Sequence, residues 1–481
     1  MGNVPVLGLA AMATALGAAA CIAPAPLPRA SKTPPAEEED EDKDAPKKEA
    51  DRSRPDLPKA SFSFAACTGA YAAARTCGVA QVPLDYAAPT GDTIEIFVAR
   101  MGSEDPNATQ LYMLQGGPGG SVDALIPYAE NVLRERPDLD ILLFEHRGVG
   151  RSSRLACPTS EQEEAGDPAA QATACLSEVK AARGDVLAHF TTSNAARDLG
   201  VAIQSLRTTQ KTFVYGVSYG TYWAHRFLQL APFDVDGVIL DSALSQTQFF
   251  DTFETQADPA LRRLAEACKQ SASCTSRLGA DPFTRMSQIV SGAATSSCGE
   301  ILALDREGVV GTVVTMLRYY KTAELVPSFL ARFQRCNSTD QQAIGNLLLG
   351  LFPEETEPPI EELHGNVLYN NVVFSELWSD PAPTTAALEQ QIASHVISSR
   401  GILDLAAVQT VWPRYEADEH VRQWAKTSMP VLTLNGDMDV QTPIESARDY
   451  ETLLTGDDKY FVFVPCANHG VIDQSEMTGG G

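Results

Sequence analysis

A short apolar run followed by the pattern G-x-S-x-G constrains the fold of this chain more than any other feature. Residues 212–216 predict a strand, and Gly216-Val-Ser218-Tyr-Gly220 predicts a sharp turn from that strand into a helix. Glycines suit such a turn because backbone lies against backbone there and leaves no room for a Cβ atom. The turn would lift the Ser218 hydroxyl above the sheet edge, at the positive end of the following helix. The pattern also occurs by chance, so its meaning depends on the rest of the chain.

The composition bounds the architecture and the partners. With 481 residues, the chain can bury one large core with an insertion, or form two domains. Its apolar share of 44% is ordinary for a globular protein. A net charge of −25 argues against nucleic acid as a partner, because phosphates would be repelled. Part of that charge lies in the acidic run at residues 37–44, which is typical of a solvated tether.

The N-terminal segment predicts export. An apolar run over residues 4–20 is short for a transmembrane helix and ends in small residues before Cys21. Residues 1–21 therefore resemble a bacterial lipoprotein signal with Cys21 as the lipidated residue. A plain secretory signal and an uncleaved anchor are the alternatives. Residues 22–60 are rich in proline, alanine and charged residues, and we expect a flexible linker there. The protein is thus expected in the cell envelope or outside the cell, with a lipid anchor as its membrane contact.

Cysteine usage agrees with an oxidising compartment. Neighbouring cysteines form the close pairs 67–77, 157–175, 268–274 and 298–336. Disulfides at these pairs would be useful outside the cytosol, although the sequence does not fix their connectivity. Cys466 is left over in this scheme. It lies three residues before His469 and is either a thiol nucleophile or a core residue.

Apolar runs alternate with helical patterns from about residue 61 onward, which predicts an α/β fold with a mostly parallel sheet and crossover helices. The expected strands cover residues 93–100, 110–114, 140–145, 212–216, 235–241, 431–435 and 460–465. The interval 245–428 contains helical patterns instead, at residues 259–269, 308–320 and 386–398. We therefore expect a core in two parts, residues 61–244 and 429–481, interrupted by a helical cap. An insertion at this end of the sheet would cover the place where ligands bind.

A serine nucleophile needs a base and a group that orients the base. His469 is the candidate base, because it follows the last predicted strand. Asp439 and Asp437 both follow the preceding strand and compete for the role of the acid. The order Ser, Asp, His is the one that this type of fold uses. His146 precedes Ser218 in the chain, and we expect it to be structural.

The developing oxyanion needs hydrogen-bond donors. The run Gln115-Gly-Gly-Pro-Gly-Gly120 follows an early strand and can turn its N–H groups toward a substrate. We expect the N–H groups of Gly117 and Tyr219 to form the oxyanion hole. Phosphate binding is the competing interpretation of a glycine-rich run, but neither G-x-G-x-x-G nor a P-loop lysine is present here.

Together these motifs resemble the α/β-hydrolase peptidases of the prolyl aminopeptidase and tripeptidyl aminopeptidase family, over roughly residues 67–470. The matching segments are Gly116-Gly-Pro-Gly-Gly, His146-Arg-Gly-Val-Gly-Arg-Ser, Gly216-Val-Ser-Tyr-Gly-Thr, Ile239-Leu-Asp-Ser, Gly436-Asp-Met-Asp-Val-Gln-Thr-Pro and Asn468-His-Gly. Residues 82–86 and 191–199 are similar to the tripeptidyl branch. The resemblance implies the roles of nucleophile for Ser218 and base for His469. It implies that Asp439, the second acidic position of its motif, is the acid.

The resemblance implies release of residues or tripeptides from the free N-terminus of peptides, with no cofactor and no metal. It also implies a cap carboxylate for the substrate ammonium group, for which Glu254 and Glu324 are candidates. Three departures stand out. Glu145 replaces the usual Asp, Gln115 replaces the commoner His, and the chain ends soon after His469, where relatives add a helix. We therefore expect a truncated or altered C-terminus.

The sequence thus predicts an exported serine hydrolase that acts on peptides. The rival interpretations are an esterase with the same three residues and a surface lipoprotein that binds peptides without cleaving them. The sequence gives neither the oligomeric state nor the peptide length preference.

Overall fold

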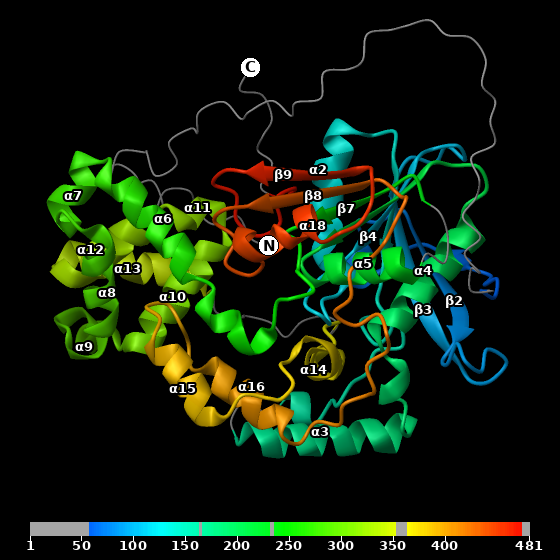
Figure 1. Cartoon of the computed structure of the whole chain (residues 1–481), viewed down its shortest axis with the longest axis horizontal. Coiled ribbons are helices and arrows are strands. Elements are labelled where there is room, and N and C mark those ends of the chain that lie inside the picture. Colours follow the sequence, from blue (N-terminus) through cyan, green and yellow to red (C-terminus); the bar gives the residue numbers. More distant parts are fainter. Residues whose placement is uncertain (1–56, 163–165, 231–234, 353–362, 474–481) are drawn as a thin grey trace, which may run out of the picture.

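The computed structural model describes residues 57–162, 166–230, 235–352 and 363–473. Within these ranges, nine strands form one sheet in the order β1-β2-β3-β5-β4-β6-β7-β8-β9, with helices on both faces (Figure 1). The predicted signal with Cys21, and the predicted linker up to residue 56, lie outside the described residues. At the end of that linker segment, the buried Leu57 packs into the main core, and the Ala60 amide donates to the Ser205 hydroxyl.

The predicted strands form the body of the sheet. Their observed bounds are β3 (Thr93–Gly102), β4 (Gln110–Leu114), β5 (Asp140–Phe144), β6 (Thr212–Val217), β7 (Gly237–Asp241), β8 (Val431–Gly436) and β9 (Lys459–Val464). From β5 to β9 all neighbours pair in parallel. Every residue of β4 and β5 is buried, as expected for strands that are covered on both faces. The predicted α/β architecture is confirmed.

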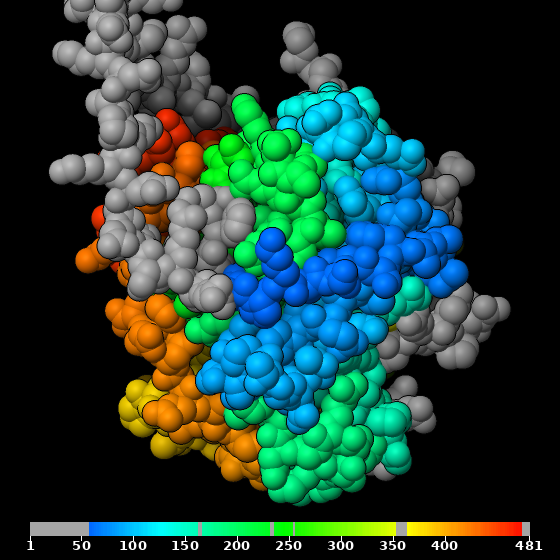
Figure 2. Space-filling view, turned by 90° about the vertical axis from the view of Figure 1, so that its right-hand side faces the viewer, coloured from blue at the N-terminus to red at the C-terminus, as the bar shows by residue number. Residues whose placement is uncertain are grey.

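Two further strands extend the sheet in the antiparallel sense. β1 (Ser63–Ala65) pairs with β2 (Thr76–Pro83), and β2 pairs with β3. The N-terminal part of the described chain, in blue, forms part of the face shown in Figure 2. Neither strand is among those expected from the sequence. β1 has only three residues, all exposed, and carries no apolar pattern.

Alternate residues of each central strand face opposite sides of the sheet. Tyr112 and Leu114 of β4 belong to the larger core, on the side of α4 and α5, whereas Leu111 and Met113 belong to the smaller core on the side of α2. The helices of the first part of the chain are α2 (Ile126–Glu135), α3 (Pro168–Arg183), α4 (Thr192–Leu206) and α5 (Tyr219–Leu230). Both faces of β4 are therefore buried in an apolar core.

The interval between β7 and β8 is helical. Its helices are α6 (Asp258–Lys269), α7 (Ala272–Leu278), α8 (Pro282–Ser291), α9 (Ser297–Leu302), α10 (Arg306–Arg318), α11 (Tyr320–Ala323), α12 (Val326–Arg335), α13 (Ser338–Leu351), α14 (Asn366–Val372), the π-helix η7 (Val373–Leu377), α15 (Thr385–Ala393) and α16 (Gly401–Gln409). After β8 come α17 (Ile444–Ala447) and α18 (Asp449–Thr452). In none of the described ranges is a helix long and apolar enough to cross a bilayer.

The inserted helices divide into two groups. Helices α6 to α13 gather to one side of the sheet in Figure 1 and share an apolar cluster of their own. In contrast, α14, η7, α15 and α16 contribute to the main core beneath the sheet. The helix predicted at residues 308–320 begins and ends two residues earlier, as α10, and the one predicted at residues 386–398 is shorter, because α15 ends at Ala393.

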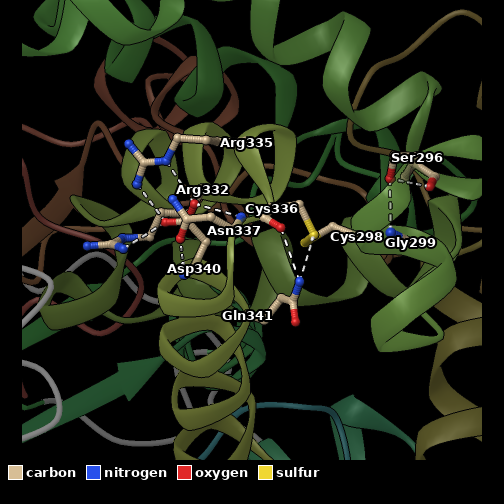
Figure 3. Close-up of a disulfide and its surroundings, with 10 residues drawn as sticks. Ser296, Cys298, Gly299, Arg332, Arg335, Cys336, Asn337, Asp340 and Gln341 are labelled. Carbon is tan, nitrogen blue, oxygen red and sulfur yellow. Dashed lines mark hydrogen bonds and ion pairs between the residues drawn. A yellow bond between two sulfur atoms is a disulfide. The ribbon is translucent and has the colours of Figure 1, made fainter.

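All four disulfides suggested by neighbouring cysteines are present. The bond between Cys298 and Cys336 ties α9 to the end of α12 (Figure 3). Beside it, Asp340 accepts hydrogen bonds from Arg332 and Arg335. Cys466 is disulfide-bonded as well, so the prediction that it is left over is wrong. A bonded sulfur carries no thiol, which excludes Cys466 as a nucleophile.

Candidate active site

The turn around Ser218 has the geometry that its glycines predict. Ser218 has a φ of 58°, in the left-handed region, between the end of β6 and the start of α5. A Cβ atom on Gly216 would overlap the carbonyl of Gly220, and one on Gly220 would overlap the carbonyl of Leu114. Only glycine fits at either position, and this close approach fixes the serine at the carboxyl end of the sheet.

His469 lies against one of the two candidate acids. Its Nδ1 atom is 3.0 Å from each carboxylate oxygen of Asp439. The Asp439 carboxylate also accepts hydrogen bonds from the amides of Gln441 and Thr442, at 2.8 and 2.9 Å. Asp437 instead accepts the amide of Cys466 at 2.7 Å. The two aspartates therefore have different partners, and only Asp439 is seen to contact the imidazole.

Opposing effects set the protonation state of Asp439. Burial favours a higher pKa for this carboxyl group, but the charge of His469 and the hydrogen bonds from His469 and Thr442 outweigh burial. The pKa of Asp439 therefore lies below its ordinary value. The group stays ionised at neutral pH and can stabilise a positive charge on the imidazole.

The loop that carries His469 is held by the end of β7. The Ser242 hydroxyl accepts the amide of Gly470 at 2.8 Å. The buried Asp241 carboxylate accepts the amides of Val471 and Ile472, at 2.8 and 2.9 Å. Sequence reasoning noted the segment Ile239-Leu-Asp-Ser but gave it no role. An aspartate directly after an apolar strand was the available signal, because burial of a carboxylate requires donors nearby.

The glycine-rich run packs directly beside the nucleophile turn. A Cβ atom on Gly116 would lie 2.6 Å from the Cβ atom of Ser218. Gln115, which stands where a histidine is commoner, accepts the Gly116 amide through its side-chain oxygen at 2.7 Å. The Gly119 carbonyl accepts the amide of Gly365 from the cap at 2.8 Å. The run is thus fixed on one side by the core and on the other side by the cap.

Glu145 supports this run from beneath. One of its carboxylate oxygens accepts the hydroxyls of Tyr71 and Ser121, both at 2.8 Å, and the other accepts the amide of Arg151 at 2.7 Å. Ser121 directly follows the glycine-rich run. Burial raises the pKa of Glu145 to about 7, although these hydrogen bonds oppose the rise. A carboxyl group with a raised pKa therefore lies under the run.

Glu145→Gln is expected to change how stability depends on pH. The folded protein holds the Glu145 proton more tightly than the unfolded chain, so the stability from this group is full below pH 4.5 and is lost as pH rises toward about 7. From the raised pKa, we expect the free energy of unfolding of the wild type to fall by roughly 3 kcal/mol relative to the variant over that interval. Urea unfolding at several pH values measures the difference, and parallel pH curves would contradict it.

Hydrogen bonds around Arg147 link three segments that resemble the peptidase family, at residues 146–152, 191–199 and 82–86. Its guanidinium makes a buried two-point ion pair with Asp198, at 2.7 and 2.6 Å. The Tyr86 hydroxyl donates to the same carboxylate at 2.8 Å. The neighbouring His146 is buried, and this burial lowers its pKa to about 3. His146 is therefore neutral, and it bonds the Arg147 carbonyl through Nδ1.

Ser218, His469, Gly117 and Tyr219 all line one cavity of about 1420 Å³. One part of its lining is apolar and aromatic, with Leu244, Phe250, Phe253 and Tyr369. Another part carries charges, on Arg134, Glu135, Arg318, Lys321 and Asp473. The cavity can therefore receive a molecule that has both an apolar and a charged portion.

One of the two candidates for the substrate ammonium group does not reach this lining. Glu324 is exposed at the end of α11 and is absent from the residues that line the cavity. Glu254 belongs to a short helical turn, but its side chain lies outside the described part of the structure. Among the described residues, no group of three or more His, Cys, Asp or Glu side chains is placed to hold a metal ion.

The carboxylates that line the cavity were missed by sequence reasoning. They are Glu135, at the end of α2, and Asp473, which follows His469 by four residues. Neither has a local signal, because exposed acids at the end of a helix or in a turn are commonplace. Only the folded chain brings them to one cavity.

Comparison with known proteins agrees with this architecture. Residues 110–280 match the family described as "alpha/beta hydrolase fold", which confirms the predicted fold class. The tripeptidyl aminopeptidase of Streptomyces lividans is 30% identical over 193 residues, which is 36% of this chain and 36% of that protein. The serine protease Hip1 of Mycobacterium tuberculosis H37Rv is 28% identical over 230 residues, or 43% of each chain.

These matches cover well under half of the relatives' length. Among solved structures, a proline iminopeptidase-related protein from Thermus thermophilus is 15% identical, with a TM-score of 0.33 over 83% of this chain and 92% of that chain. The match of residues 110–280 and the observed sheet show an α/β-hydrolase fold, and the chain is similar in part to proteins named peptidases.

Proposed function

We propose that this chain, with its α/β-hydrolase fold, is a serine peptidase that releases residues or tripeptides from the free N-terminus of peptides. The observation that carries the proposal is the gathering of Ser218, His469 and the glycine-rich run around one cavity, with Asp439 against the imidazole. The partial similarity to a tripeptidyl aminopeptidase supports the substrate class.

In this mechanism, the Ser218 hydroxyl oxygen attacks the carbonyl carbon of the scissile bond. His469 accepts the hydroxyl proton as the bond forms and then donates a proton to the leaving amine. Asp439 holds Nδ1 of His469 in its protonated form and stabilises the imidazolium. The N–H groups of Gly117 and Tyr219 donate to the oxyanion of the tetrahedral intermediate. Water then attacks the acyl-enzyme, and the same residues return the enzyme to its starting state.

Export is part of the proposal. Four disulfides in the described residues suit an oxidising compartment, since such bonds are rare in the cytosol. A secretory signal within residues 1–21 would supply the route.

A single substrate series tests the proposed activity. We expect cleavage of a chromogenic tripeptide amide with a free amine and at least about a hundredfold weaker cleavage of its N-acetylated form, because an acetyl group removes the positive charge. A nitrophenyl ester of a short acid serves as the third substrate. Hydrolysis of the ester with both peptides untouched would replace the peptidase by an esterase. Peptide binding without any hydrolysis would indicate a binding protein.

A further inference from the structure

Two arginines that line the cavity have no partner in the described part of the chain. Arg134 lies in the last turn of α2, on the core side, and Arg318 ends α10, on the cap side. Both side chains are exposed. Neither makes a hydrogen bond or ion pair with any described residue, although both border the same cavity as Ser218.

Exposed arginines without a carboxylate partner are unexpected on this protein. It carries 62 acidic and 37 basic residues, so an exposed guanidinium is surrounded by potential partners. Most of its other arginines do pair with a carboxylate. Arg136 is a direct contrast, because it lies two residues from Arg134 and pairs with Asp138 at 2.7 Å. Among the described residues, the two arginines at the cavity therefore have no carboxylate partner.

The other charges of the lining do not neutralise this pair. Burial raises the pKa of the Asp473 carboxyl group above its ordinary value, and the positive charge of Lys321 opposes that rise. Glu135 is the remaining acid, and it follows Arg134 on α2, where successive side chains point about 100° apart. The charged lining thus holds three cations and two anions in a protein with a net charge of −25.

We propose that Arg134 and Arg318 bind a carboxylate of the substrate, which is either the C-terminal carboxylate of a short peptide or an acidic side chain. Guanidinium groups suit this ligand because their N–H donors match the two carboxylate oxygens. The arginines come from the core and from the cap, so a carboxylate between them would also bridge the two parts of the cavity. Local cations would offset the repulsion that the overall negative charge exerts on an anionic substrate. This inference rests on the proposed peptidase function.

The experiment compares matched peptides. One pair differs only in a C-terminal carboxylate or amide, and a second set places Glu or Gln at successive positions after the scissile bond, with the C-terminus amidated. We expect kcat/KM to be about tenfold higher for one kind of carboxylate, which corresponds to about 1.4 kcal/mol. In R134Q/R318Q the carboxylate-to-amide ratio should fall to about one. In E135Q the ratio should rise, because a competing anion is removed.

The matched control is Arg285→Gln, at an exposed arginine of α8 that bonds only the Gln288 side chain and does not line the cavity. This variant should keep the wild-type ratio. A preference for the free C-terminal carboxylate over the amide would show that the arginines bind the peptide C-terminus. A preference for Glu over Gln would show that they bind an acidic side chain. Equal kcat/KM for charged and uncharged peptides in the wild type would overturn the inference. So would a ratio that survives in R134Q/R318Q.

Calorimetric binding of the same peptides to Ser218→Ala separates this inference from the proposed activity. If the wild type cleaves peptides without regard to charge, the peptidase stands and the carboxylate site is wrong. If no peptide is cleaved but Ser218→Ala binds the carboxylate forms about tenfold more tightly, the carboxylate site stands and the peptidase is wrong.

Discussion

Ser218→Ala is expected to lower kcat/KM for any substrate of this protein by roughly a million-fold, while the protein remains folded. The loss is large because the remaining groups act on a nucleophile that is no longer present, and loss of a catalytic serine alone costs about as much as loss of all three residues. The fold should survive because the turn depends on Gly216 and Gly220, which the substitution leaves in place. Ser218 already has a φ of 58°, and alanine inherits that conformation.

Two measurements check this expectation. Initial rates on the tripeptide amide and on the nitrophenyl ester give the change in kcat/KM, and a fluorophosphonate probe reports an activated serine directly. Ser276→Ala is the control, because Ser276 lies in α7 of the cap and its hydroxyl donates only to the Ser273 carbonyl. Undiminished labelling of Ser218→Ala would mean that the activated serine lies elsewhere in the chain.

The sheet and the nucleophile turn could be predicted because their signals are local. The apolar run before Gly216 and the glycines around Ser218 determine strand, turn and helix within a dozen residues. The strands β4 to β7 could be predicted in the same way, since strands buried on both faces are continuous apolar runs. β9 is also a continuous apolar run, although it lies at the sheet edge and none of its residues is buried. β1 has no such run, and only its pairing with β2 creates it.

The gathering of charged residues at the cavity could not be predicted. Arg134, Arg318 and Asp473 come from α2, from α10 and from the segment after His469, and none of them carries a pattern that distinguishes it from a solvated side chain. The candidate carboxylate Glu324 shows the same limit, because it lies in the helical interval between β7 and β8 but outside the lining. Where a helical insertion packs over the sheet depends on tertiary contacts, and these decide which of its charges reach the site.

Asp439→Asn is expected to lower kcat by about ten-thousandfold, as removal of the negative charge does in comparable sites. The neighbours of Asp439 explain the size of the loss. The amides of Gln441 and Thr442 both donate to the same carboxylate oxygen, so an asparagine would turn its carbonyl toward them. Its NH₂ group would then face Nδ1 of His469 as a donor. That contact favours the tautomer with the proton on Nε2, in which the imidazole cannot accept the Ser218 proton.

Asp437→Asn is the matched control, because it makes the same chemical change two residues away. Asp437 accepts the amide of Cys466, and the carbonyl oxygen of asparagine can accept it equally well. We therefore expect kcat for this variant to stay within several-fold of the wild-type value, with the amide at Cys466 still satisfied. Pre-steady-state rates at pH 7 for both variants compare the two acids on one substrate. Equal losses in the two variants, or a larger loss in Asp437→Asn, would transfer the role of the acid away from Asp439.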